Sequence, residues 1–426
     1  MWTFLVCGIV LLLFAWGKFR DKMLYPSVIF CFMWRMNCIF HFFIYQGYVN
    51  PLVPVSEFKY HYMDNYIIYF TAASVLGFSL ARRMYGHLDI NINFSVEHVE
   101  NILYKHRWIM WLNFWGGILR IVAMISLVGF SFSNIIDSRN AANSMMVSFQ
   151  GGFVGWVFRL TAYVNMLAVM YIAFSGFLAG IGTLNMRKVL YLFILYAPVQ
   201  IATGGRLFIL YFIIFFFGSF LLGRGVSVNS EDRLWLESKE KSAIIRMMLI
   251  MLPLVVAISL ARGKGGVQNI TSYKGSYIDS FSYFCDGTMV ADKCMTFFRG
   301  GTQLDEAHGA NTFLGDSKAA RQFGKFKHHT KYASSVRCVI VPIFLDFGYW
   351  GSIIAWFFLS FLVESIAIKN LNNLTIIRFI VFVFLLKMMY ESVMTNPFAA
   401  NIAFFELLIL FAIFSKQIFG VYEKQE

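Results

Sequence analysis

The sequence predicts an all-α protein that crosses a membrane many times, and three observations lead to this fold class. Hydrophobic residues make up 58% of the 426 residues and charged residues only 14%, with a mean hydropathy of +0.63. A soluble domain carries roughly 25% charged residues, so much of this chain does not face water. Apolar runs of about 20 residues recur from end to end. The segments between the runs alternate in their content of Lys and Arg.

These observations exclude several classes of protein. The apolar content rules out a soluble enzyme, a disordered hub and a disulfide-rich secreted module. A nucleic-acid binder is excluded as well, because the net charge of +13 is accounted for by the loops between membrane-spanning runs.

The apolar runs predict about eleven membrane-spanning helices in a single membrane domain, residues 1–426. Lipid offers no hydrogen-bond partners to exposed backbone groups, so each run must be helical to cross it. The sequence shows no internal repeat and no second soluble domain. The runs lie at 2–17, 25–45, 63–81, 108–130, 153–180, 189–203, 207–222, 243–260, 348–368, 375–394 and 397–415.

The basic residues of the short loops predict the orientation, because loops rich in Lys and Arg stay in the cytoplasm. The loops after the first, third, fifth and seventh runs are the richer ones. Those after the second, fourth and sixth runs hold one basic residue each. The N-terminus is therefore expected outside, and the C-terminus, with Lys416 and Lys424, in the cytoplasm.

One loop, residues 261–337, is much longer than the others, and the alternation places it outside. It carries eleven Lys or Arg against six acidic residues, which leaves a net charge of +5. A structureless loop of this length is uncommon in a compact domain, so its aromatic residues and Gly-rich turns predict a folded cap. Cys285 and Cys294 lie in it, nine positions apart. An oxidising compartment permits a disulfide between them, and two separate packed thiols are the alternative.

A Gly-Gly-Arg sequence interrupts two apolar runs at the predicted outer surface. Gly204 and Gly205 break the helix and bring backbone N–H groups close together, and Arg206 adds a fixed cation at the start of the next helix. A helix end with exposed amides and a guanidinium is suited to bind an anion. The alternative is a tight turn whose arginine extends to the membrane surface.

Ionisable side chains inside the apolar runs are further candidates, because burying a charge in lipid is costly. Arg120 lies in the middle of its run and Arg159 about two turns below the outer surface, so both are candidates for anion binding. Lys387 and Glu391 are spaced i,i+4 and are expected to pair with each other. Glu406 is expected to pair with another helix.

The long loop and its return into the membrane supply the remaining candidates. Arg299 stands before two glycines, and His308 follows two acidic residues in the densest acid–base cluster of the loop. A histidine titrates near neutral pH and can accept a proton from a sugar hydroxyl, although most loop histidines are merely solvated. Arg337 and Asp346 flank the return. No Cys-x-x-Cys or His-Glu-x-x-His spacing occurs, so neither a metal nor another cofactor is expected.

Three stretches, in this order, resemble the oligosaccharide repeat-unit polymerases, the Wzy family of O-antigen polymerases. They are Thr203–Arg206 leading into an apolar helix, Tyr273–Phe281 early in the long loop, and Phe344–Gly351 at the start of the next run. Many spans and one large, late outer loop are also features of that family. The resemblance covers roughly residues 200–370, and residues 1–150 match in hydropathy only.

The resemblance implies a metal-independent membrane glycosyltransferase fold, GT-C-like, in the bacterial inner membrane. Such polymerases transfer the growing glycan from undecaprenyl diphosphate to a hydroxyl of the next lipid-linked repeat unit, at the periplasmic face. Without a metal, the leaving diphosphate needs fixed cations, and arginine provides bidentate contacts to phosphate. We therefore expect catalysis from His308, Asp346 and Arg299, and diphosphate binding from Arg206, Gly204, Gly205, Arg337, Arg159 and Arg120.

The expected partner is an undecaprenyl-diphosphate-linked oligosaccharide within membrane lipids. A chain-length regulator protein is a candidate partner, and no nucleic acid is expected. Two alternatives stay open. An O-antigen ligase has the same donor but a lipid A-core acceptor. A polysaccharide flippase or other transporter usually has related halves with paired broken helices near the midplane, whereas the clear break in this sequence lies at the predicted outer surface.

Overall fold

The computed structural model describes residues 2–19, 24–45, 62–86, 90–128, 152–203, 208–227, 276–299, 338–393 and 400–415, with three single positions between 242 and 249. Every element in these ranges is an α-helix, which confirms the all-α class for them. The chain divides into two compact units. Unit 1 comprises Met1–Asn91 and Gly275–Phe411, and unit 2 comprises Ile92–Lys274 and Ala412–Glu426. The single membrane domain stays a prediction.

The helices coincide closely with the apolar runs. The run at 243–260 lies outside the described residues, apart from two single positions, Ile245 and Leu249. Helix α13 begins eight residues before its run, and α4 and α11 lie outside all runs. The bounds are α1 Trp2–Lys18, α2 Pro26–Tyr45, α3 Met63–Tyr85, α4 Val96–Lys105, α5 Trp108–Val128, α7 Gly152–Ile181, α8 Met186–Thr203, α9 Phe208–Ser227, α11 Ser276–Phe297, α13 Ile340–Asn372, α14 Ile376–Glu391 and α15 Ala400–Ser415.

Two of the described helices are long and apolar enough to cross a membrane. They are Leu160–Ile181 within α7 and the whole of α13, both with a mean hydropathy of 1.9 over their most apolar windows. Large apolar side chains are also exposed on the helix surfaces, among them Trp16, Leu76 and Phe358 in unit 1. Exposed apolar surfaces of this extent mark contact with a membrane or a partner, which supports association with a membrane.

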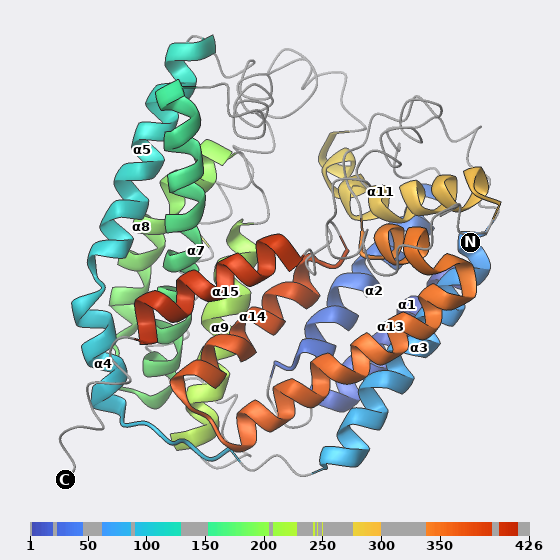
Figure 1. Ribbon diagram of the computed structural model, residues 1–426, viewed down its shortest axis with the longest axis horizontal. Helices are drawn as coiled ribbons and strands as arrows, with labels where there is room; N and C mark the ends of the chain where they lie inside the picture. The colour runs from blue at the N-terminus through green and yellow to red at the C-terminus, as the bar shows by residue number, and fades with distance from the viewer. Residues whose placement is uncertain are drawn as a thin grey trace. The chain divides into compact units, whose positions relative to one another are not determined.

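In unit 1, α13 lies alongside α3 and runs in the same direction, although the two helices are far apart in the sequence (Figure 1). Three contacts establish the direction, because the residue numbers increase along both helices from one contact to the next. Tyr66 donates to Ser352 over 2.9 Å, Trp356 donates to Ser74 over 2.7 Å, and Arg82 pairs with Glu364 over 2.8 Å. Helices α1 and α2 are antiparallel, because Phe4 contacts the ring of His41 while Gly8 faces Cys38.

Helix α13 is broken at Gly348, whose backbone angles are φ 69° and ψ −170°. Only glycine adopts this region without strain, because an L side chain there clashes with the backbone. The break divides α13 into a short segment, residues 340–347, and a long segment, residues 349–372. It lies inside the stretch Phe344–Gly351 that was singled out in the sequence.

In unit 2, α7 and α9 pack backbone to backbone through glycines. A Cβ atom added at Gly176 would lie 2.4 Å from the carbonyl oxygen of Phe216, and one added at Gly180 would lie 2.1 Å from that of Phe220. Gly176 and Gly180 are four residues apart on one face, as in the small-residue interfaces of membrane helices. The order of the contacts shows that α7 and α9 run parallel.

Helices α5 and α8 also pack closely and run parallel. The side-chain amide of Asn113 donates to the carbonyls of Leu195 and Tyr196 over 3.2 and 3.5 Å, in the turn before Pro198. A proline inside a helix removes a backbone donor and loosens the preceding turn, and the Asn113 amide adds hydrogen bonds to two carbonyls of that turn. One turn further along, Gly117 lies against Pro198 and Val199.

The described part of the long loop is α11, which packs on α2, α3 and α13. The disulfide that the sequence permitted between Cys285 and Cys294 does not form in this structure. Cys285 and Cys294 lie on this one helix, and nine residues at roughly 1.5 Å each separate them by about 14 Å. The Cα atoms of a disulfide lie only about 4.4–6.8 Å apart. Cys294 is a free, buried thiol.

Candidate functional site

One end of unit 1 gathers chemistry-bearing side chains from helices that are distant in the sequence. We call it the α11 end. Here Gly287 of α11 faces Cys338 and the carbonyl of Val393. The backbone N–H of Val339, where the long loop returns into α13, donates to the carbonyl of Ser392 over 2.8 Å. The start of α13 and the last residues of α14 are therefore joined at this end.

Asp292 of α11 anchors the N-terminus of α3 at the α11 end. Its carboxylate Oδ1 accepts the backbone N–H groups of Tyr62 and Met63 over 2.9 and 2.8 Å, and the residue is buried. A helix leaves its first N–H groups without partners, and a negative charge there complements the helix dipole. This contact fixes α11, and with it part of the long loop, to the helices below.

A buried polar layer connects α11 to α2. His41 and Asn37, one turn apart on α2, both hydrogen-bond the hydroxyl of Thr288, and all three are fully buried. Sequence reasoning missed this layer. The signal was available, since a histidine and an asparagine four residues apart in an apolar run point to one shared polar partner.

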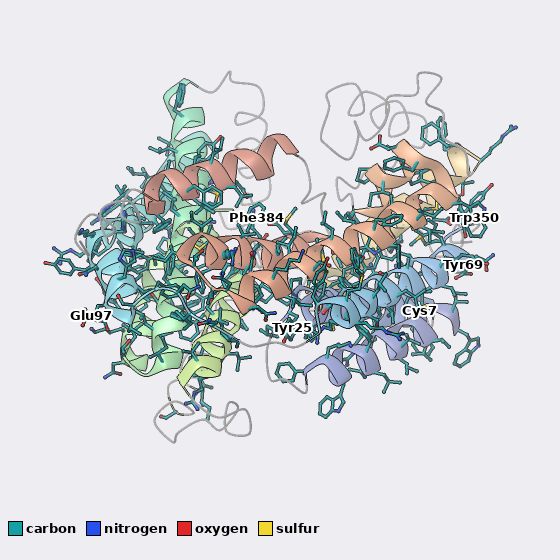
Figure 2. The ribbon with its side chains drawn as sticks, turned by 60° about the horizontal axis from the view of Figure 1, so that its bottom comes forward. Cys7, Tyr25, Tyr69, Glu97, Trp350 and Phe384 are labelled. Atoms are coloured by element: carbon teal, nitrogen blue, oxygen red, sulfur yellow. The ribbon has the colours of Figure 1, made fainter. Side chains whose placement is uncertain are left out.

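The break in α13 places Asp346 and a group of aromatic rings at the α11 end. Asp346 lies two residues before the break, in the short segment, and is buried. On the other side of the break, the ring of Tyr349 lies 5.2 Å from that of Tyr66, and the ring of Trp350 lies 5.1 Å from that of Tyr69. Figure 2 shows Tyr69 and Trp350 together at one edge of the molecule. A helix break exposes backbone groups that a ligand can bind.

Arg299 lies directly beyond the C-terminus of α11. It has a φ of 50°, the one positive φ of a non-glycine residue among the described residues, and its side chain is exposed. A left-handed residue commonly ends a helix, and a cation there complements the helix dipole. Arg299 is seven residues beyond Asp292, or about 10 Å along the axis.

A triad of charged side chains joins α14 to α15. The Nζ atom of Lys387 lies 2.6 Å from Oε2 of Glu406 and 3.8 Å from Oε1 of Glu391, and all three side chains are 15–20% exposed. Both expected pairings are confirmed: Lys387 with Glu391 on its own helix, and Glu406 with another helix.

In unit 2, Arg120 is buried between α5 and α7, where its Nη1 donates to the hydroxyl of Thr161 over 3.3 Å. Helices α5 and α8 run parallel, and Gly117 of α5 lies beside Val199 of α8. One turn further along both helices, Arg120 therefore lies at the same height as Thr203. Thr203 is the last residue before the Gly-Gly-Arg sequence. Arg159 lies on α7, and its side chain is outside the described atoms.

The other predicted site residues lie outside the described residues. These are His308, Arg337, Gly204, Gly205 and Arg206. Of the candidates that are described, Asp346 and Arg299 belong to unit 1, and Arg120 belongs to unit 2. Within the described ranges, no three His, Cys, Asp or Glu side chains gather as metal ligands would.

Comparison with protein-family models, with curated proteins and with solved structures gives no match for this chain.

Proposed function

We propose that the protein polymerises lipid-linked oligosaccharide repeat units at the periplasmic face of the bacterial inner membrane. In this reaction the growing glycan moves from undecaprenyl diphosphate to a hydroxyl of the next lipid-linked repeat unit. The observation that carries the proposal is the break in α13 at Gly348. It falls in the stretch that resembles the polymerase family and adjoins the buried Asp346 and the helix α11 of the long loop.

The proposed topology has eleven spans, an outer N-terminus and a cytoplasmic C-terminus. Helix directions inside each unit support it. The loop charges give α3 and α13 the same direction, and these helices run parallel. The same agreement holds for α5 with α8 and for α7 with α9. In this topology the α11 end faces the periplasm, and the ion pair of Arg82 and Glu364 lies toward the cytoplasm.

Arg120 has the chemistry of a group that helps to hold the lipid diphosphate. Its side chain is buried, and the other residues of α5 are mostly apolar. Along the helix axis, Arg120 lies at the same height as the C-terminal end of α8. A fixed cation in such surroundings interacts strongly with an anion, because little water screens it. Together with Arg206, Arg120 would offset the charge that develops on the leaving diphosphate. The family's metal-independent glycosyltransferase fold is part of the same proposal.

Deletion of the gene tests the proposed function. A polymerase defect leaves lipopolysaccharide with a single repeat unit at the cell surface. A ligase defect leaves no repeat unit attached to the lipid A-core, although lipid-linked glycan collects outside. A flippase defect leaves none outside. A surface carrying single repeats is the expected result, and either of the other two phenotypes would replace the polymerase with that alternative.

A further inference from the structure

Three helices of unit 1 carry an apolar stripe on their exposed surface: α1, α3 and the long segment of α13. The side chains in the middle of each stripe are large, apolar and 40–65% exposed. On each helix they are four residues apart and so lie on one face. Exposed apolar surface of this extent marks contact with a membrane or a partner. These side chains are Ile9 and Leu13 on α1, Leu76 and Leu80 on α3, and Ile354 and Phe358 on α13.

The three helices run in the same direction, so corresponding parts of their stripes lie at similar levels. Near the start of α1 and α3 the hydroxyl of Thr3 donates to Asp64 over 3.2 Å, and further along the ring of Phe14 lies 6.4 Å from that of Phe78. Helix α13 runs parallel to α3. All three stripes therefore start at the α11 end, where Asp292 holds the N-terminus of α3.

Each stripe has an aromatic ring at the α11 end and a cation at the opposite end. The rings of Tyr69 and Trp350 lie 5.1 Å apart, and both side chains are exposed. Tyrosine and tryptophan are enriched where a membrane meets water, because one part of each side chain is apolar and another is polar. The stripes begin at Trp2, Tyr69 and Trp350 and end at Lys18, Arg83 and Lys369.

The stripes have the length and composition of a surface that faces hydrocarbon. From ring to cation they cover 16, 14 and 19 residues on α1, α3 and α13, or roughly 24, 21 and 28 Å along the helix. The hydrocarbon core of a bilayer is about 30 Å thick, and long basic side chains extend from it to the headgroups. The charged side chains within these limits are Arg82 and Glu364, which pair with each other over 2.8 Å and are 14% and 0% exposed.

Two of the cations are suited to bind an anion. Arg83 and Lys369 are exposed, and among the described residues no acidic side chain forms an ion pair with either. The ammonium of Lys369 stands 4.3 Å from the ring centroid of Tyr85. This cation–π contact orients the side chain without neutralising its charge. Basic side chains at the end of an apolar surface complement the phosphates of anionic lipids.

We propose that unit 1 faces lipid along these three stripes, and that Arg83 and Lys369 bind the headgroups of anionic phospholipids at the cation end. The rings of Trp2, Tyr69 and Trp350 lie among the headgroups of the opposite leaflet. In the proposed topology the cation end belongs to the cytoplasmic leaflet. The inference does not depend on polymerase activity, since it requires only that the protein lies in a membrane.

Native mass spectrometry of the full-length protein, titrated with phosphatidylglycerol or phosphatidylcholine, tests the headgroup contacts. Each cation removed should weaken binding of phosphatidylglycerol about fivefold, so the double variant Arg83→Gln/Lys369→Gln should lose about 25-fold, with no change for phosphatidylcholine. Arg83→Gln alone serves if the double variant does not fold. Lys293→Gln, at a partly exposed position of α11, is the matched control and should keep the wild-type affinity. An unchanged affinity in the double variant, or an equal loss in Lys293→Gln, would overturn the headgroup contacts.

Spin labels at Leu76→Cys and Phe358→Cys test the stripes themselves in phosphatidylglycerol-containing nanodiscs. The labels are introduced with Cys285→Ser, because the other five cysteines are buried. Oxygen, which concentrates in hydrocarbon, should reach both labels, and a water-soluble nickel chelate should reach neither. Access by the chelate would overturn the lipid contact, and so would shielding from both reagents, which would indicate a protein partner. Neither measurement involves polymer formation, so its failure leaves the proposed function standing.

Discussion

The guanidinium Nε of Arg82 lies 2.8 Å from Oε1 of Glu364, and this pair joins two helices whose contacting residues are more than 280 positions apart in the chain. The same carboxylate accepts the backbone N–H and the hydroxyl of Ser27, over 3.1 and 2.7 Å, at the start of α2. The guanidinium carbon of Arg82 stands 3.9 Å from the ring centroid of Tyr25. One fully buried carboxylate therefore holds the ends of α2 and α3 against α13.

Replacing Glu364 by Gln should destabilise the protein strongly. Removing one partner of a buried ion pair leaves the other charge uncompensated, at a cost of about 3–5 kcal/mol. Thermal unfolding in detergent measures the effect, with Glu100→Gln on the exposed face of α4 as the control. A double variant that also removes the charge of Arg82 should recover part of the loss. Equal melting temperatures for Glu364→Gln and Glu100→Gln would mean that the pair contributes nothing.

Gly348→Ala should impair both stability and polymerisation. A Cβ atom at φ 69° and ψ −170° costs about 1–3 kcal/mol, and relieving that strain would move the helix break that adjoins Asp346. Gly351→Ala is the matched control, because it adds a methyl group three residues away, beside the Cβ of Phe347 and at no positive φ. The measurements are thermal stability and the polysaccharide ladder. If both variants behave alike, the special backbone of Gly348 is not required.

Two other glycines offer a test of helix packing without reference to the site. Gly180→Ala places a Cβ atom 2.1 Å from the carbonyl oxygen of Phe220 and should separate α7 from α9, with a clear loss of stability. Gly17→Ala on α1 meets no atom within 4 Å and should stabilise its helix by roughly 0.5–1 kcal/mol. Opposite signs in the two melting shifts are expected. A neutral Gly180→Ala would show that the two helices can move apart freely.

Cys285 and Cys294 should both be free thiols. Intact mass after alkylation of the unreduced, denatured protein should show that each has reacted. In the folded protein Cys294 should react slowly, because burial raises the pKa of its thiol and little of the reactive thiolate forms. A mass that lacks two alkyl groups and regains them after reduction would contradict the helical separation of the two residues.

Arg206 should be indispensable if it binds the leaving diphosphate. Loss of a fixed contact to developing charge costs about 10²–10³ in rate. Lys keeps the charge but lacks the planar fork of arginine. We expect Arg206→Ala to be nearly inactive and Arg206→Lys severely impaired, read from the polysaccharide ladder at equal membrane levels. Arg378→Lys is the control, since Arg378 is partly exposed and donates to the carbonyl of Asn373 over 2.8 Å. A normal ladder from Arg206→Ala would remove this residue from the site.

Much of the helix placement could be predicted from the sequence, because nearly every apolar run in the described residues forms one helix. The bounds of α1, α2 and α3 follow from hydropathy, with small differences at the ends. The pairing of Lys387 with Glu391 followed from helical spacing. The beginning of α13 could not be predicted in this way, because residues 340–347 form a separate helical segment that ends at a glycine break. A hydropathy profile averages over many residues, so it does not reveal a break at a single glycine.

Less of the candidate site could be predicted. The Gly-Gly-Arg sequence stands out because adjacent glycines and a cation separate two apolar runs, and the stretch around Gly348 because an acidic residue and two glycines lie where a run begins. The sequence indicates that His41 needs a polar partner, but the partners of Asp292, Thr288 and His41 could not be identified from it, because they lie more than 200 positions away. The sequence left the choice between a Cys285–Cys294 disulfide and two separate thiols open for a related reason. Spacing alone does not reveal that nine residues form a straight helix, which keeps its ends apart.

The discontinuity of unit 1 has a consequence for how the chain is made. Residues 1–91 of this unit leave the ribosome before all of unit 2, and residues 275–411 follow it. At about 5–20 residues per second, the carboxylate of Glu364 is synthesised roughly 14–56 s after Arg82. Until then α2 and α3 have α1 beside them but lack α13, so the faces that α13 covers must stay exposed or be shielded by a chaperone. A chain truncated before residue 338 should therefore be recognised and degraded, even though most of its helices are present.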